Sequence, residues 1–92
     1  MELTKLNENF QLKDKSQNGW LAIGTVGYSV DGDVYISAAI DNELETPIGR
    51  FTYHKPIQGD ILLEYDISED LRDEFTYYID TLIDSILEYF NN

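Results

Sequence analysis

Apolar and polar residues along the middle of the chain form runs that are typical of β-strands. Residues 20–30, 34–40, 48–54 and 61–67 are rich in β-branched and aromatic residues, and short polar connections separate them. Because each run follows the last after only a few residues, neighbouring strands are expected to pair in antiparallel fashion. The pattern therefore predicts a β-meander of about four strands.

The connection between the first two runs contains the dipeptide Asp-Gly at residues 31–32. A two-residue type I′ hairpin turn requires positive φ at both central residues, and Asp-Gly is one of the sequences that it favours. With this turn, Tyr28 is expected to pair with Tyr35, and Val26 with Ser37. The sequence thus predicts a tight hairpin with a defined register.

This register assigns side chains to the two faces of the sheet. One face is expected to form the core against a helix and gathers Leu21, Ile23, Val34, Ile36, Ala38 and Ile40. The other face is expected to carry Tyr28 and Tyr35 as a cross-strand aromatic pair, together with Trp20. Two interpretations stay open: a second layer covers these rings, or they form an exposed patch that anchors a partner.

Residues 1–18 are mostly polar and are expected to form an N-terminal segment outside the meander. Within it, residues 9–13 alternate as in a short strand, and residues 14–19 have the composition of a turn. This segment is the candidate for a second layer over the aromatic face.

The last quarter of the chain, residues 68–91, predicts an amphipathic helix. Ser68 is a favourable N-cap, and acidic residues follow it in the first turn. Apolar residues recur at spacings of three and four and predict one buried stripe: Leu71, Phe75, Ile79, Leu82, Ile86 and Phe90. The expected fold is α+β, with an antiparallel meander packed on one C-terminal helix in a single domain, residues 1–92.

Composition supports a folded chain. Hydrophobic residues make up 42% and aromatic residues 13%, which is too rich for a disordered acidic tail. We expect a cytoplasmic protein, because the N-terminus lacks the plan of a signal peptide and no apolar run is long enough to span a membrane.

Charge is the most informative property of the sequence. The net charge is −12, and most of it lies in residues 57–92, which contain Arg72 as their one base. The acidic residues of this region are Asp60, Glu64, Asp66, Glu69, Asp70, Asp73, Glu74, Asp80, Asp84 and Glu88. Such charge would repel nucleic acid and anionic lipid, so we expect neither as a direct partner.

The acidic residues of the predicted helix fall on one side of it. At 100° per residue, Asp73, Asp80, Asp84 and Glu88 point away from the apolar stripe, with Tyr77 among them and Asp70 at the edge. Carboxylates four residues apart lie about 6 Å apart along the axis. One DNA strand carries a charge about every 3.4 Å, so the row is about half as dense.

Acidic residues of the preceding strand and turn, Asp60, Glu64 and Asp66, are expected to add a second row. Like charges at this spacing weaken a helix by a few tenths of a kcal/mol each, roughly. The helix retains these repelling carboxylates without lysines between them. This favours a functional role for the acidic residues, such as binding a basic protein.

Signatures of catalysis and of metal binding are missing from the sequence. The chain has no cysteine and one histidine, His54, so neither a zinc site nor a histidine-based triad can be assembled from it. Residues 31–33 (Asp-Gly-Asp) resemble a fragment of a calcium loop but lack its remaining ligands. The glycines match no phosphate-binding motif. We therefore expect that the protein is not an enzyme and that it binds no metal ion and no cofactor.

In size, acidity and its meander-plus-helix pattern, the whole chain resembles the small acidic anti-defence proteins of phages and mobile elements. This class includes anti-CRISPR proteins, anti-restriction DNA mimics and inhibitors of uracil-DNA glycosylase. The resemblance is one of general character, without a matching motif. It implies a stoichiometric inhibitor whose carboxylates occupy the basic channel of a nucleic-acid-binding enzyme in the cytoplasm of a bacterial cell.

The surface expected to bind that basic partner comprises Asp70, Asp73, Tyr77, Asp80, Asp84, Glu88, Glu64, Asp66, Tyr28 and Tyr35. Two alternatives stay open. An immunity protein that neutralises a bacterial toxin would use the same acidic surface. A non-inhibitory assembly module would instead form a homodimer through the face that carries Tyr28 and Tyr35.

Overall fold

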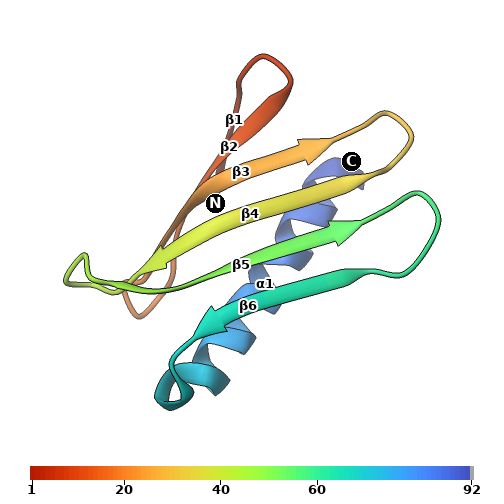
Figure 1. The fold of residues 1–92 in the computed structure, drawn as a ribbon. Helices are drawn as coiled ribbons and strands as arrows, with labels where there is room; N and C mark the ends of the chain where they lie inside the picture. Colours follow the sequence, from red (N-terminus) through yellow and green to blue (C-terminus); the bar gives the residue numbers. More distant parts are fainter. Residues whose placement is uncertain (92) are drawn as a thin grey trace.

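A computed structural model describes residues 1–91, which form one antiparallel sheet of six strands covered on one side by a C-terminal helix (Figure 1). The strands are β1 (Glu2–Lys5), β2 (Asn9–Lys15), β3 (Leu21–Tyr28), β4 (Val34–Asp41), β5 (Pro47–Lys55) and β6 (Leu62–Ile67). A short 3-10 helix, η1 (Glu69–Leu71), leads into α1 (Arg72–Asn91). Strand order in the sheet follows strand order in the chain. The predicted α+β meander with a C-terminal helix is confirmed, but the predicted number of strands is wrong.

The two additional strands lie in the polar N-terminal segment. β1 pairs with β2, and β2 pairs with β3, so this segment extends the sheet and does not cover it as a second layer. Leu12 is fully buried beneath α1, while Gln11 and Lys13 beside it are exposed. Because one face of these strands meets water, eight of their eleven residues are polar, and they give no apolar run. The alternation of residues 9–13 did indicate a strand, and β2 covers those residues.

The hairpin between β3 and β4 has a longer turn than predicted. The Ser29 N–H donates to the Asp33 carbonyl at 3.0 Å, and the Gly32 N–H donates to the Ser29 carbonyl at 3.0 Å. Gly32 alone supplies the positive φ, at 100°. This is the three-residue type of loop, a turn followed by a left-handed residue, and not a two-residue type I′ turn.

The longer turn shifts the register by one residue. Tyr28 pairs with Val34, and Gly27 pairs with Tyr35, so the predicted pairing of Tyr28 with Tyr35 is wrong. A shift of one residue moves a whole strand's side chains to the opposite face. The assignment of β4 survives, because Val34, Ile36, Ala38 and Ile40 are all buried.

The assignment of β3 is therefore reversed. Ala22 and Val26 are fully buried against α1, whereas Ile23 is 45% exposed on the other face. Leu21, two residues before Ile23, shares that face and is only partly buried. Trp20, which we expected on the outer face, is buried and packs against Phe75 and Tyr78 of α1.

Hairpin loops of the same design recur in residues 16–20, 29–33 and 42–46. In each, the first and fifth residues share a backbone hydrogen bond, and the fourth residue has positive φ: Gly19, Gly32 and Glu45. The side chain of the first residue, a serine or an asparagine, accepts a hydrogen bond from the N–H of the fifth at 3.0 to 3.1 Å. This repeated loop sets the register of three successive hairpins.

α1 closes the core with the predicted stripe. Phe75, Ile79, Leu82 and Ile86 are buried, and Leu71 and Phe90 pack against the same core at its ends. Ser68 occupies the N-cap position, but its hydroxyl makes no capping hydrogen bond; its carbonyl accepts the Leu71 N–H at 3.1 Å. In Figure 1 the helix runs behind the sheet from the end of β6 toward the end of β3.

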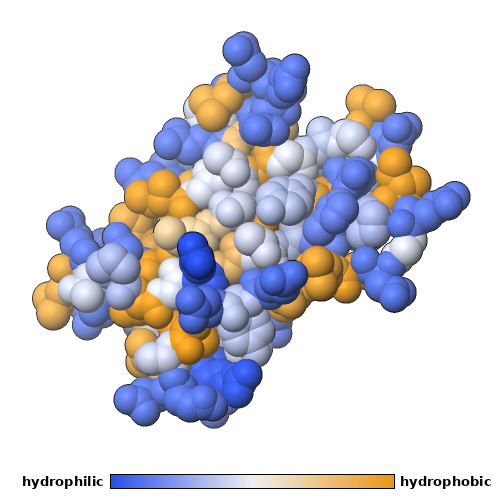
Figure 2. Space-filling view, viewed as in Figure 1, coloured by the Kyte–Doolittle hydropathy of each residue, from blue (hydrophilic) through white to orange (hydrophobic). Residues whose placement is uncertain are grey.

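The opposite face of the sheet carries no helix in residues 1–91 and is turned toward the viewer in Figures 1 and 2. We call it the open sheet face. The centre of this face in Figure 2 is pale, which fits the central cross-strand row of Thr25, Ser37 and Thr52. Strongly hydrophilic side chains gather mainly around its margin.

Candidate partner-binding surface

The outward side of α1 carries the predicted row of carboxylates. Asp73, Asp80, Asp84 and Glu88 are all exposed, and Tyr77 stands among them with 77% of its surface accessible. Asp70 is exposed in η1, just before the helix begins. We call Asp73, Asp80, Asp84 and Glu88 the acidic helix face. The prediction that these side chains lie opposite the apolar stripe is confirmed.

These carboxylates keep their charge unpaired by neighbouring bases. Arg72 is the one basic residue in residues 69–91, and its guanidinium pairs with Glu69 at 3.2 Å. The other ion pairs found in residues 1–91 join the N-terminus to Asp14 and His54 to Asp33. The acidic helix face is therefore free to attract a cationic surface.

One flank of this face borders β5 and β6. Burial, and then the charge of Asp84, raise the pKa of the Tyr53 hydroxyl on β5. Hydrogen bonding to Arg72, and then to Thr76, lowers the pKa of the Tyr65 hydroxyl on β6, and the charge of Asp80 opposes this effect. Asp80 and Asp84 thus lie close enough to the strands for their charge to be felt there.

The other flank borders the loop between β2 and β3, and a groove of about 690 Å³ separates the two. Its helix side consists of Asp73, Glu74, Tyr77, Tyr78 and Thr81. Its loop side consists of Lys15, Ser16, Gln17 and Asn18. We call this feature the loop–helix groove. Sequence reasoning missed it, because it depends on how β2 and α1 pack together.

The inner wall of the groove is held by a polar contact between distant parts of the chain. The Tyr78 hydroxyl donates a hydrogen bond to the Asp14 carboxylate at 2.6 Å, and the Tyr78 ring meets Trp20 edge-on with centroids 6.2 Å apart. Burial, followed by the Asp14 hydrogen bond and charge, raises the pKa of Tyr78 well above its ordinary range. Tyr78 therefore stays neutral and fixed beside the exposed ring of Tyr77.

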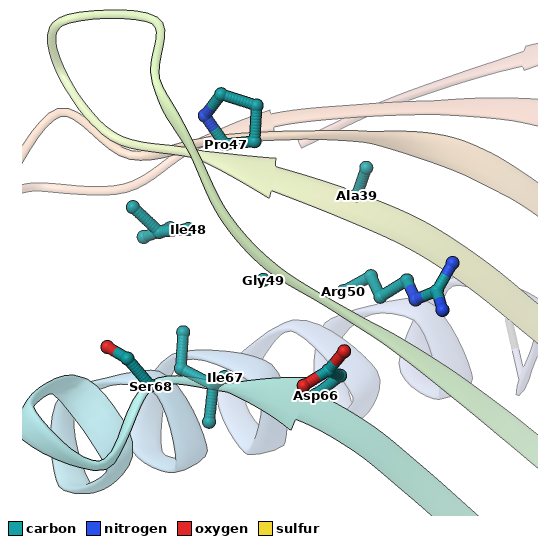
Figure 3. A pocket seen from close by; sticks show the side chains of 8 residues that line it. All are labelled: Ala39, Pro47, Ile48, Gly49, Arg50, Asp66, Ile67 and Ser68. Atoms are coloured by element: carbon teal, nitrogen blue, oxygen red, sulfur yellow. The ribbon is translucent and has the colours of Figure 1, made fainter.

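The remaining predicted contact residues lie elsewhere. Glu64 pairs with Thr52, and Asp66 pairs with Arg50, so both carboxylates belong to the open sheet face. Figure 3 shows Asp66 near Arg50 at one end of a shallow hollow by the end of β6, with Ile48 and Ser68 at its other end. The prediction that these acids, with the exposed Asp60 of the β5–β6 connection, add a second row beside the helix is wrong for Glu64 and Asp66.

The two predicted anchor tyrosines lie on opposite faces. Tyr28 stacks on Phe90 of α1, with ring centroids 4.4 Å apart and planes within 8°. Tyr35 is 48% exposed on the open sheet face and meets His54 edge-on at 5.7 Å. The cross-strand aromatic pair that we expected from these two residues is therefore not formed.

His54 and Asp33 form a polar pair at the margin of the open sheet face. The His54 Nε2 lies 2.8 Å from the Asp33 Oδ1, so this histidine helps to fix the loop between β3 and β4. Among residues 1–91, no group of three or more His, Asp and Glu side chains is arranged to hold a metal ion.

Within the described part of the chain, α1 is too polar to qualify as a membrane-spanning helix, and no other helix is long enough. Comparison of the chain with protein-family models, with curated proteins and with solved structures gives no significant match in any of the three. We therefore infer the function from the exposed surfaces of the protein.

Proposed function

We propose that this protein is a stoichiometric inhibitor that uses the acidic helix face to occupy the basic nucleic-acid-binding site of an enzyme, as a nucleic-acid mimic would. The observation that carries the proposal is the row of exposed, unpaired carboxylates on a helix whose other side is anchored in the core. From Asp73 to Glu88 the row extends about 22 Å along the helix axis.

The row has the form that a basic groove can engage. Asp80, Asp84 and Glu88 follow one another at intervals of about 6 Å, compared with about 3.4 Å between phosphates along a DNA strand. Tyr77, next to this row, offers an aromatic ring of the kind that often anchors interfaces. Complementary charge speeds association of such a pair and makes binding dependent on salt.

An immunity protein against a basic toxin nuclease would bind in the same way, so the proposal covers both biological settings. The assembly-module alternative loses its main support, because Tyr28 is stacked against α1 and cannot join Tyr35 in an interface on the sheet. The acidic helix face is also unsuited to self-association, since two copies would bring like charges together.

The experiment compares two double charge reversals with the same change in net charge. D80K/D84K alters the acidic helix face, and E64K/D66K alters exposed carboxylates on the open sheet face. Each protein is immobilised and exposed to a bacterial lysate, and the proteins released by a salt step are identified by mass spectrometry. A captured nucleic-acid-binding protein is then assayed for DNA binding with each variant as competitor.

We expect the wild type and E64K/D66K to displace DNA from the captured protein, and D80K/D84K to lose this activity. Chemical denaturation verifies that both variants remain folded. If a folded D80K/D84K protein competes as well as the wild type, or if the wild type captures no nucleic-acid-binding protein, the proposed function is wrong.

A further inference from the structure

The geometry points to the loop–helix groove as a docking site for an arginine side chain of the basic partner, an inference that rests on the proposed function. The groove shares Asp73 with the acidic helix face and includes the neighbouring Tyr77, so a protein bound along the helix would pass its entrance. Its lining combines aromatic surface with carboxylates at the edge, which suits a side chain with an apolar stem and a cationic, planar head.

The aromatic part of the groove is already held in place. Tyr78 is fixed by its hydrogen bond to Asp14 and by packing against Trp20, which is only 4% exposed. Tyr77, its neighbour in sequence, presents most of its ring to solvent at the same groove. A guanidinium group can stack on such a ring and gain more from it than an ammonium group does.

The charged part of the groove comes from Asp73 and Glu74, both exposed in the first turn of α1. The helix dipole makes this end of α1 positive, so these two carboxylates decide the sign of the potential at the groove. Each can accept hydrogen bonds from a guanidinium, and a carboxylate binds arginine in a two-pronged geometry that lysine cannot match.

The loop wall is rigid and polar. The Ser16 carbonyl accepts the Gly19 N–H at 3.1 Å, and the Ser16 hydroxyl accepts the Trp20 N–H at 3.0 Å and donates to Asn18. Lys15 contributes to the same wall, but its pairing with Leu21 assigns its side chain to the open sheet face.

The charge of the loop–helix groove disfavours occupants other than a cationic side chain. An anionic ligand would meet Asp73 and Glu74 at the edge of the groove, and a second copy of this chain would bring a net charge of −12 to an already acidic surface. An arginine from a basic protein is the occupant whose charge and shape both fit.

The test is a titration of isotope-labelled protein with an oligoarginine peptide, followed by backbone amide NMR shifts at about 50 mM salt, where exposed charges are weakly screened. An oligolysine peptide of the same length is the matched probe. We expect oligoarginine to shift the amides of residues 16–18 and 73–81 most strongly, and to bind several-fold more tightly than oligolysine. Equal affinity for the two peptides, or shifts confined to residues 84–91, would overturn the inference.

Two variants that remove equal charge separate the groove from the rest of the helix. D73N/E74Q alters the groove, and D84N/E88Q alters the distant part of the acidic helix face. We expect D73N/E74Q to weaken oligoarginine binding about tenfold, and D84N/E88Q to weaken it by about twofold or less. A similar loss in both variants would show that the peptide binds diffusely and would overturn the inference.

Failure of this inference is distinguishable from failure of the proposed function. If the wild type displaces DNA from a captured protein and D73N/E74Q does so equally well, the groove is not the arginine site although the inhibitor proposal stands. If no nucleic-acid-binding protein is captured, the inhibitor proposal fails, and the peptide titration still reports whether the groove selects arginine.

Discussion

Tyr77 and Tyr78 are neighbours in sequence with opposite environments. Tyr77 is 77% exposed on the outward side of α1, whereas Tyr78 turns toward β2 and donates to Asp14. Helical periodicity distinguishes the two, because residues one apart on a helix point about 100° away from each other. Tyr77 is therefore accessible to a partner, whereas Tyr78 holds the helix against the sheet.

The Tyr78 hydroxyl gives the fold a pH dependence in the alkaline range. In the unfolded chain a tyrosine ionises with a pKa of about 10, while the folded protein holds the pKa of Tyr78 above that value. Between the two pKa values the unfolded state has lost a proton that the folded state keeps. The free energy of unfolding should thus fall by about 1.4 kcal/mol per pH unit from this group as pH rises above about 10.

The variant Tyr78→Phe tests this pH dependence and the contribution of the Tyr78 hydrogen bond to stability. We expect it to cost about 1–2 kcal/mol at neutral pH through the lost hydrogen bond and to flatten the alkaline loss of stability. Urea unfolding monitored by Trp20 fluorescence at several pH values measures both. Tyr77→Phe is the control, and an alkaline slope that is the same in Tyr78→Phe and wild type would contradict the assignment.

Residue-level features were predictable only where they depend on local periodicity. The exposure of Tyr77, Asp80 and Asp84 follows from helix geometry, and the structure agrees. The contact of Tyr78 with Asp14 joins residues 64 positions apart and requires β2 to lie in the sheet beneath α1. Because the sequence predicts that residues 1–18 lie outside the meander, it does not predict this contact or the groove beside it.

At the scale of the elements, the length of the hairpin loops determines whether the predicted register and the predicted faces of the strands are correct. Asp-Gly at residues 31–32 suits a two-residue turn, but Ser29 and Asp33 also suit the longer loop that the protein uses, and the two differ by one residue of register. The recurrence of a serine three positions before a glycine, at Ser16 and Gly19 and again at Ser29 and Gly32, was the signal that the sequence offered.

Glu45 is the exception among these loops, because it holds the left-handed position that glycine holds in the other two, with φ of 63°. A non-glycine residue costs about 1 kcal/mol there, partly offset by the greater freedom of glycine in the unfolded chain. We therefore expect Glu45→Gly to raise the free energy of unfolding by about 0.5 kcal/mol.

Glu45→Gln is the matched control for this prediction, since it removes the charge without changing the backbone preference. Urea unfolding of both variants measures the difference. Equal stability of Glu45→Gly and Glu45→Gln would show that the left-handed backbone at Glu45 stores no strain.

At the scale of the molecule, negative charge is concentrated in the C-terminal helical segment. Residues 69–91 carry seven acidic residues and Arg72, whereas the other bases all lie in strands: Lys5, Lys13, Lys15, Arg50 and Lys55. Lys13 and Arg50 share a cross-strand row of the open sheet face with Asp66, so charges of both signs meet there. Repulsion between like charges is therefore concentrated along α1. The carboxylates that the proposed function requires thus lower the stability of the folded protein.

Salt should relieve that repulsion. Raising the salt concentration from about 50 mM to about 500 mM shortens the screening length several-fold, so we expect the free energy of unfolding to rise by about 1 kcal/mol. D80N/D84N should be more stable than wild type at low salt and should gain less from added salt. Urea unfolding at the two salt concentrations tests this, and a stability that falls with salt would contradict it.

The neighbour-to-neighbour order of the strands also has a consequence for how the chain folds during synthesis. Each strand pairs with the one made just before it, so every closure spans a short loop and has a small entropic cost. α1 follows all of these strands and is therefore translated after them. Until it leaves the ribosome, Val26, Ile36 and Phe51 have no helix to cover them, and the nascent sheet presents an apolar side that chaperones can hold.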